Sequence, residues 1–472
     1  MNFSSPIFLF FFLPAVFLLD RAIRGTRAKN IVLAAASLVF LAFGQLAFVP
    51  LFLLEVLVDY LAGRLLMRLE KGRKAVLVLT VVLDLGILAV FKYTDFVLAN
   101  LNSLFASSIR LTGIALPLGI SFFTFQGISY VADTYRDRNA GTGDFWDVLL
   151  FMSFFPQLVQ GPILRYGDFG PQLAAREITP ERTVSGARRF ITGLAKKVLL
   201  SAAAAKVADG VFAMKGLIDW RLAWLGGICY ALQLYYDFSG YSDMAVGLAR
   251  MFGFSIAENF DLPYSASSVR NFWRRWHISL SSWFRDYLYI PLGGSRKGKT
   301  RKYLNRMIVF LCTGIWHGAN WTFIVWGLLH GVLCNLEDGG ILPVDRLEKT
   351  RPGRIVNRLY TLLAVMLLFV LFRADSLADG AAMIRSMFAF SASPEGAYAA
   401  GRLLPAATCL MLVLGIVFAG GLAAKIRTFC SHLESGSKAG ALAGHLLSIL
   451  LFALCLTAMA RGGFSPFIYT RF

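Results

Sequence analysis

Histidine is scarce in this chain, and its placement is the first feature that could support chemistry. Five histidines occur in 472 residues, and three of them, His277, His317 and His330, fall within residues 277–330. His317 lies in the otherwise apolar run 312–331. Burial disfavours the imidazolium, so such a histidine stays neutral and can take a proton from a hydroxyl near pH 7. We therefore predict that His317 is a general base, although a lone buried histidine is also often satisfied by a backbone carbonyl.

Aromatic and polar neighbours make these histidines candidate parts of a binding site. The candidate substrate-binding residues flank His317 and His277 in the sequence: Trp316, Asn320, Trp276, Arg274 and Arg275. His330 follows His317 by thirteen residues, so on an unbroken helix it would point about 220° away. Its role stays open between packing and site. The dispersed histidines lack the converging spacing of a metal centre, and we predict no metal.

Two further patterns in the sequence are not assigned a catalytic role. Asp237 and Asp243 are six residues apart and do not share a helix face. Because buried carboxylates must be paired or protonated, we expect both to orient a histidine or hold an arginine. Residues 293–300 match a phosphate-binding loop letter for letter. That motif requires a strand before it and a helix after it in an α/β domain, which the surrounding sequence does not predict.

The elements that position these residues are predicted to be membrane helices. The chain is 57% hydrophobic and only 16% charged, with a mean hydropathy of +0.61. This composition excludes a soluble enzyme, a disordered chain and a fibre. The apolar runs have approximate bounds 6–19, 30–46, 47–66, 75–97, 111–131, 188–213, 220–235, 307–334, 354–373, 402–420 and 444–461. They predict an all-α polytopic membrane protein with about ten to twelve transmembrane helices.

Some segments at membrane depth need separate interpretation. Residues 145–164 are apolar but are broken by Pro156, Gly161 and Pro162, which predicts a re-entrant segment. The N-terminal run to residue 19 lacks a basic start and a small-residue cleavage site, so we expect a retained helix rather than a signal peptide. Six cysteines lie in or beside apolar runs without CxxC spacing and predict neither disulfides nor a zinc site.

Charge is distributed in the manner of a membrane protein. The net charge is +19, and most basic residues lie between apolar runs, which predicts cytoplasmic loops, an external N-terminus and no nucleic-acid partner. Residues 270–306 stand out because they carry ten Lys or Arg against the single acid Asp286, together with several Trp and Tyr. This stretch is typical of a cytoplasmic interfacial segment, and it could also receive an anionic ligand such as a nucleotide-bearing acyl donor.

Three runs resemble the membrane-bound O-acyltransferases, and specifically their bacterial alginate O-acetyltransferase branch. They are residues 236–250, residues 271–294 with Arg-Trp-His, and residues 314–331 with Trp-His-Gly. Shorter runs at 3–10, 117–126 and 155–165 are similar to that branch as well. The resemblance extends to about residue 335, and beyond it only generic apolar helices follow.

The resemblance implies a fold, a reaction and roles for two histidines. It implies a ring of helices around a cytoplasm-facing funnel, with one membrane-embedded acyltransferase domain over 1–472 and a catalytic core at about 111–335. His317 is implied as the catalytic histidine and His277 as the second functional one, which would orient a thioester or assist proton transfer. The expected enzyme uses acetyl-CoA as a substrate, binds no resident cofactor, and acetylates an extracytoplasmic polysaccharide such as alginate.

The implied partners are the lipid bilayer, the polysaccharide and a separate extracytoplasmic acceptor protein of serine-hydrolase type. The implied location is the inner membrane of a bacterium. Two alternatives remain open at this point. A transporter or flippase for an envelope precursor would use the histidines as a proton relay and would show paired, interrupted helices in two halves, which we do not find in the sequence. A structural scaffold of an export complex would not need His317 at all.

Overall fold

The computed structural model describes residues 1–214, 218–461 and 467. Within this part of the chain, the regular structure is helical, and the single extended pairing is an antiparallel bridge between Phe260 and Trp276. The chain divides into two compact units. One comprises residues 1–190 and 242–258, and the other comprises residues 191–241 and 259–472.

The first unit is built from helices that share an aromatic core. Its main helices are α1 (Leu13–Ala22), α2 (Thr26–Gln45), α3 (Val49–Arg68), α4 (Arg73–Phe105), α5 (Ile120–Arg136), α6 (Phe145–Ser153), α7 (Tyr166–Ala174) and the start of α8 (Pro180–Ala195). Phe8, Phe12 and Phe40 pack with Phe155 in this core, with ring centroids 5.4–6.2 Å apart. Aromatic pairs of this kind add to the free energy gained by burying their area.

Two predicted segments of this unit are corrected or refined. The span expected at 111–131 begins late, because α5 starts only at Ile120, after Pro117 and Gly119. Gly119 has a φ of +79°, which a glycine adopts without steric cost. After α6 ends at Ser153, residues 154–164 form no helix, yet all of them are buried. Irregular backbone is tolerated in a membrane protein when protein covers it, which agrees with the predicted break.

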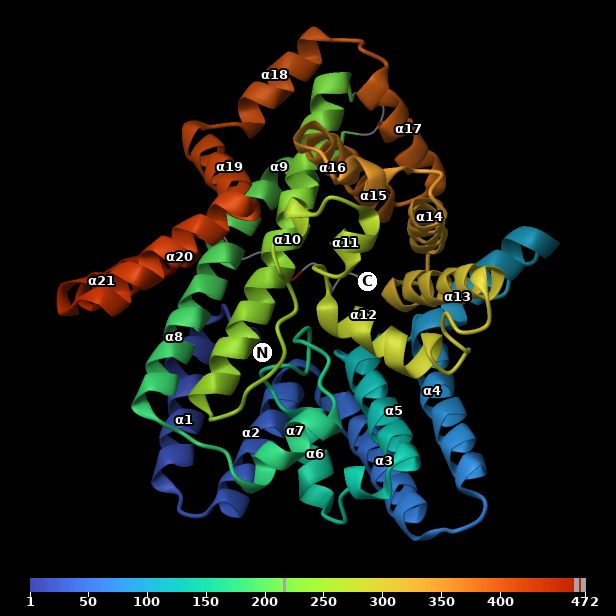
Figure 1. Ribbon diagram of the computed structural model, residues 1–472, viewed down its shortest axis with the longest axis vertical. Helices are drawn as coiled ribbons and strands as arrows, with labels where there is room; N and C mark the ends of the chain where they lie inside the picture. Colours follow the sequence, from blue (N-terminus) through green and yellow to red (C-terminus); the bar gives the residue numbers. More distant parts are fainter. Residues whose placement is uncertain (215–217, 462–466, 468–472) are drawn as a thin grey trace. The chain divides into compact units, whose positions relative to one another are not determined.

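The second unit contains the helices that carry the histidines (Figure 1). Its helices are the end of α8, α9 (Ala202–Phe212), most of α10 (Trp220–Met251), α11 (Val269–Trp273), α12 (Ile278–Phe284), α13 (Lys299–His317), α14 (Trp321–Asp338), α15 (Val344–Leu347), α16 (Arg351–Arg373), α17 (Leu377–Phe388), α18 (Pro394–Leu403), α19 (Ala406–Ala419), α20 (Gly421–Gly436) and α21 (Lys438–Ala460). The five described cysteines are free.

The predicted single span at 307–334 is wrong in detail, because two helices cover this run. Helix α13 ends at His317 and α14 begins at Trp321. The side chain of Asn320 accepts a hydrogen bond from the backbone N–H of Thr322 and so caps α14. A side chain at Gly318 would collide with the ring of Phe323, so a glycine is required at this turn. His317 therefore lies at the tip of a helical hairpin.

Glycines also allow the two arms of this hairpin to pack closely. A methyl group at Gly314 would collide with the backbone oxygen of Phe323, and one at Gly327 would collide with that of Phe310. Small residues at helix contacts of membrane proteins permit such close approach. The packing of α13 against α14 sets the relative positions of His317 and His330. The angle expected for thirteen residues of one unbroken helix does not apply to them.

Several described helices are long and apolar enough to cross a membrane. Four meet this criterion, in the ranges Thr26–Arg68, Arg73–Phe105, Arg351–Arg373 and Lys438–Ala460. The pair α18 and α19, bent by 81°, forms a fifth if it is counted as one span. The chain is thus a multi-pass helical membrane protein, while the predicted number of ten to twelve spans stays a prediction.

Candidate active site

His277 lies fully buried at the start of α12, between two short helices. It forms the N-cap position of α12 with φ +46°, a left-handed conformation that costs a residue with a side chain of order 1–3 kcal/mol. The ring of Phe238 from α10 approaches edge to face at 4.6 Å, and the ring of Trp316 lies 5.8 Å away. Burial lowers the pKa of His277 to about 3, so the imidazole is neutral at pH 7.

Asn259 holds His277 through both its main chain and its side chain. The backbone oxygen of Asn259 accepts a hydrogen bond from Ile278 at 3.0 Å. Its side-chain Oδ1 lies 3.2 Å from Nδ1 of His277 and also accepts from the N–H and the hydroxyl of Ser279, at 3.2 and 2.9 Å. The neighbouring bridge between Phe260 and Trp276 completes a short ribbon. This ribbon fixes the strained backbone of His277.

His317, at the end of α13, is 4% exposed and is surrounded by aromatic rings. Trp316, Trp326 and Phe372 lie 5.0, 5.0 and 5.2 Å from its ring. Phe372 comes from the end of α16, beyond the predicted core boundary at about residue 335. The catalytic candidate is thus enclosed by α13, α14 and α16 together.

His330 belongs to the same aromatic cluster, which the sequence could not establish. Its Nδ1 accepts a hydrogen bond from the indole N–H of Trp273 at 3.2 Å, and its ring lies 4.9 Å from Trp326. Trp316 therefore contacts both His277 and His317, and Trp326 contacts both His317 and His330. The three histidines are linked through two indole rings within one unit of the chain.

The predicted binding residues fall into different environments. Trp276, which directly precedes His277, is 3% exposed, and its ring stacks on that of Phe272. Asn320 uses its oxygen for the cap of α14 and donates its amide N–H to the backbone oxygen of Asp375 at 3.0 Å. The structure therefore shows Asn320 engaged in shaping the hairpin tip. Its role in substrate binding stays a prediction, as does that of Trp316.

The basic stretch 270–306 separates into two groups. Arg270, Arg275, Arg285, Lys302 and Arg306 form ion pairs with acidic side chains. The others are exposed and form no ion pair with an acid in the described ranges: Arg274, Arg296, Lys297, Lys299 and Arg301. Four of these five lie in or beside the loop that precedes α13. The free positive charge predicted for an anionic ligand is concentrated there.

Both predicted carboxylates have cationic partners. Asp237 of α10 forms a buried ion pair with Lys197. Asp243 accepts from the guanidinium of Arg189 at 2.8 Å, and Arg189 also contacts Glu258. These contacts agree with the predicted supporting role. Residues 293–298 precede α13 and residues 299–300 begin it, and the described ranges contain no strand before this segment, which a phosphate-binding loop requires.

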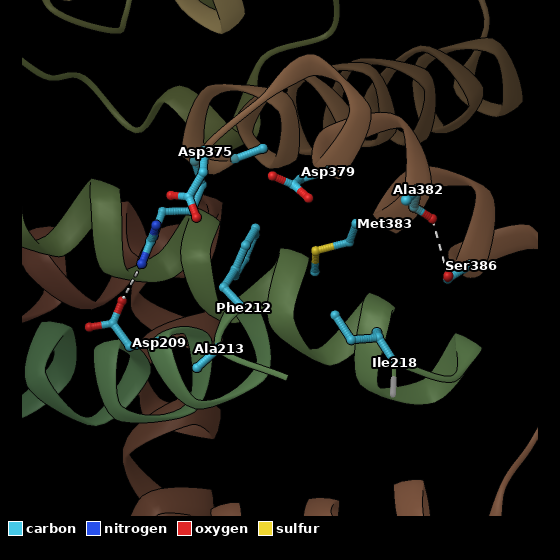
Figure 2. Close-up of a pocket in the computed structure, with 11 residues that line it drawn as sticks. Asp209, Phe212, Ala213, Ile218, Asp375, Asp379, Ala382, Met383 and Ser386 are labelled. Atoms are coloured by element: carbon cyan, nitrogen blue, oxygen red, sulfur yellow. Dashed lines mark hydrogen bonds and ion pairs between the residues drawn. The ribbon is translucent and has the colours of Figure 1, made fainter. Parts of the chain in front are cut away.

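A separate cavity of about 300 Å³ lies between α9 and α17 (Figure 2). Arg373 contributes to its wall, pairs with Asp209 at 3.0 Å and covers the ring of Phe212. Asp375, whose backbone oxygen accepts from Asn320, also lines this cavity. The cavity is therefore connected structurally to the tip of the histidine hairpin.

Sequence reasoning missed several residues that shape this site. Asn259 and Phe372 contact the histidines but lie outside the motif runs, and Trp326 lies inside the run 314–331 but was not singled out there. No group of three or more His, Cys, Asp or Glu side chains is arranged to hold a metal within the part of the chain that the structure describes. The imidazoles of His277, His317 and His330 are buried in an apolar, aromatic environment.

The buried histidines belong to a multi-pass helical membrane protein, and comparison with known proteins specifies its class. The model of the MBOAT, membrane-bound O-acyltransferase family matches residues 136–357, which include His277, His317 and His330. The chain belongs to this family, and it is an acyltransferase.

The relatives cover nearly all of the chain. It is similar to the probable alginate O-acetylase AlgI of Azotobacter vinelandii, with 38% identity over 507 residues and full coverage of both chains. It is 42% identical to that of Pseudomonas aeruginosa, over 83% of this chain and 75% of the relative. It is also 36% identical to the peptidoglycan O-acetyltransferase of Helicobacter pylori, over 82% and 79%. The predicted family and the predicted enzyme class are confirmed.

Proposed function

We propose that this protein moves an acetyl group from cytosolic acetyl-CoA across the bacterial inner membrane for O-acetylation of an extracytoplasmic polysaccharide such as alginate. The observation that carries the proposal is the burial of His317 at a hairpin tip, in one aromatic cluster with His277. The names of the relatives support acetyl transfer to a cell-envelope polymer.

The exposed basic residues around the start of α13 support the choice of donor. Arg296, Lys297, Lys299 and Arg301 form a cluster of four cations without acidic partners in the described ranges. The phosphates of a CoA thioester carry the complementary charge, and such a cluster raises the local concentration of an anionic substrate. Positive loops also face the cytosol in membrane proteins, where acetyl-CoA is present.

The atoms and electrons of the proposed reaction balance without an oxidant or a metal. His317 takes the proton of an acceptor hydroxyl as the hydroxyl oxygen bonds to the thioester carbonyl carbon. The bond between that carbon and sulfur then breaks, and the CoA thiolate receives the proton from His317. The products are an acetyl ester and CoA with a free thiol.

The acceptor side requires a partner outside the cytosol. We propose that a separate extracytoplasmic protein of serine-hydrolase type receives the acetyl group or completes its transfer to the polysaccharide. No resident cofactor is needed for this scheme, because acetyl-CoA is consumed as a substrate.

The proposal is tested with purified protein in detergent and acetyl-CoA labelled on the acetyl group. Release of CoA, or transfer of label to alginate when extracytoplasmic proteins of the same cells are added, is expected for the wild type and not for His317→Ala. Oligosaccharides of peptidoglycan serve as the second acceptor. Folded wild-type protein that transfers no label in either mixture would contradict the proposal, as would full activity of His317→Ala.

A further inference from the structure

The hydrogen bonds around His277 determine which of its ring nitrogens carries the proton. Oδ1 of Asn259 accepts a hydrogen bond from the backbone N–H of Ser279, which can only donate. The atom facing Nδ1 of His277 is therefore the amide oxygen and not the amide nitrogen. An amide oxygen only accepts, so Nδ1 of His277 must carry a hydrogen.

In a neutral imidazole, the second nitrogen then has a free lone pair. Nε2 of His277 is buried and has no hydrogen-bond partner among the residues that the structure describes. It can accept a hydrogen bond or a proton, but it cannot donate one. His330 has the opposite arrangement: its Nδ1 accepts from the indole of Trp273, so its Nε2 carries the hydrogen.

We propose that Asn259 is a positioning residue that holds His277 in the tautomer whose Nε2 offers a free lone pair to the site, so that His277 assists proton transfer rather than polarising the thioester carbonyl. This inference rests on the proposed function and decides between the two roles that His277 could have. Polarising the carbonyl of a thioester requires a donor. In this tautomer, Nε2 of His277 carries no hydrogen and cannot donate. Of the two histidines whose tautomer is fixed by hydrogen bonds, only His330 has an N–H at Nε2.

The surroundings of His277 allow a direct test by pH. The elements packed against it present aromatic rings, Phe238 from α10 and Trp316 from α13, and burial is the one cause that lowers its pKa. The nearest charged residues along the chain are Arg274 and Arg275, of which Arg274 is exposed and Arg275 is paired with Asp261. The wild-type imidazole therefore stays neutral throughout the range from pH 5 to 9.

Asn259→Asp places a carboxylate against Nδ1 with little change in shape. A carboxylate at hydrogen-bond distance favours the imidazolium and raises its pKa by about one to three units. The imidazolium has no lone pair at Nε2, so the variant should lose acetyl transfer at acidic pH, where the wild type remains active. Ser279→Ala is the matched control, because it removes one hydroxyl contact of Asn259 and leaves the bond to Nδ1. It should keep the wild-type pH profile whatever its rate.

The experiment measures CoA release from acetyl-CoA between pH 4 and 9 for the wild type, Asn259→Asp and Ser279→Ala. Because the pKa of His277 is about 3 in the wild type, a rise of about one to three units should give Asn259→Asp an acidic limb with a midpoint at about pH 4 to 6, which the other two proteins lack, with a fall in kcat larger than any rise in KM. A profile that superimposes on that of the wild type would overturn the inference. Asn259→Ala should lower kcat about 10- to 100-fold, as for other residues that orient a functional histidine.

A spectroscopic measurement tests the tautomer without relying on activity. In protein labelled with ¹⁵N at histidine, the imidazole shifts distinguish hydrogen on Nδ1 from hydrogen on Nε2, and His277→Gln assigns the signals. The expected result is Nδ1–H at His277 and Nε2–H at His330. An Nε2–H tautomer at His277 would overturn the inference even if acetyl transfer is confirmed. The expected tautomers in a protein that transfers no acetyl group would contradict the proposed function alone.

Discussion

The buried carboxylate of Glu337, at the end of α14, accepts hydrogen bonds from both the backbone N–H and the side chain of Arg270, at 3.0 and 3.2 Å. It also accepts from the backbone N–H of Val269 at 2.6 Å. One acid thus fixes the start of α11, which leads through Trp273 to His277. Glu337 lies beyond the predicted core boundary, and its effect on the site depends on the tertiary structure.

Replacing Glu337 is expected to destabilise the protein strongly. Glu337→Ala leaves the backbone N–H groups of Val269 and Arg270 without their acceptor, although the Arg270 side chain keeps Asp338 and Asp345, and each buried donor left unsatisfied costs about 1–3 kcal/mol. The midpoint of thermal unfolding in detergent should fall. Asp345→Asn is the matched control, because Asp345 also pairs with Arg270 but its side chain is 80% exposed, and exposed pairs contribute about 0–1 kcal/mol. Equal effects of the two variants would refute this ranking.

The stability of the protein should fall as the pH drops below about 6.5, partly because of His277. Its pKa is about 3 in the folded protein and about 6.5 when exposed. Between these values the unfolded chain binds one more proton than the folded one, so unfolding is favoured progressively as pH decreases. Unfolding midpoints measured from pH 7 to 4 should fall less steeply in His277→Gln. His445→Gln, at an exposed position of α21, should retain the wild-type slope.

The hairpin of α13 and α14 provides a test of close packing. Gly327→Ala directs a methyl group at the backbone oxygen of Phe310, which cannot move without shifting α13. Overpacking of this kind costs about 1–3 kcal/mol, and it should also displace His317 and lower kcat. Gly331→Ala meets Sδ of Met307 at 2.9 Å, a flexible side chain that can turn away. The second variant should be milder in both unfolding midpoint and kcat, and the opposite order would contradict the packing described here.

The exposed cations around the start of α13 should affect binding of the donor rather than the chemical step. The double variant Lys297→Glu, Lys299→Glu is expected to raise KM for acetyl-CoA several-fold with little change in kcat. The reason is that these cations attract the CoA phosphates equally in the ground state and in the transition state. The effect should shrink at high salt. The double variant Lys425→Glu, Lys438→Glu, at exposed positions of α20 and α21, is the control with the same change in net charge. An unchanged KM would exclude this loop from the donor site.

The sequence predicted the class of fold and the important histidines, but not how they are brought together. His317 and His277 stand out because ionisable residues are rare in apolar runs and because their motifs resemble a known family. The hairpin was missed because its turn, residues 317–320, is too short to interrupt an apolar run when hydropathy is averaged over about 19 residues. Asn259 was missed because its contact with His277 joins residues 18 positions apart through an irregular ribbon, which no helical period reports. Phe372 and Glu337 reach the site only through helix packing.

Asn320 allows the cap of α14 to be separated from the contact with Asp375. Asn320→Asp keeps an oxygen that accepts from the N–H of Thr322, but it loses the N–H that Asn320 donates to the backbone oxygen of Asp375. Asn320→Ala loses both, and loss of a cap alone costs about 0.5–2 kcal/mol. Unfolding midpoints should therefore decrease in the order wild type, Asn320→Asp, Asn320→Ala. If Asn320 also binds substrate, both variants should raise KM beyond what their stability explains. If it only shapes the hairpin tip that carries His317, kcat should fall in the same order as stability while KM stays near the wild-type value.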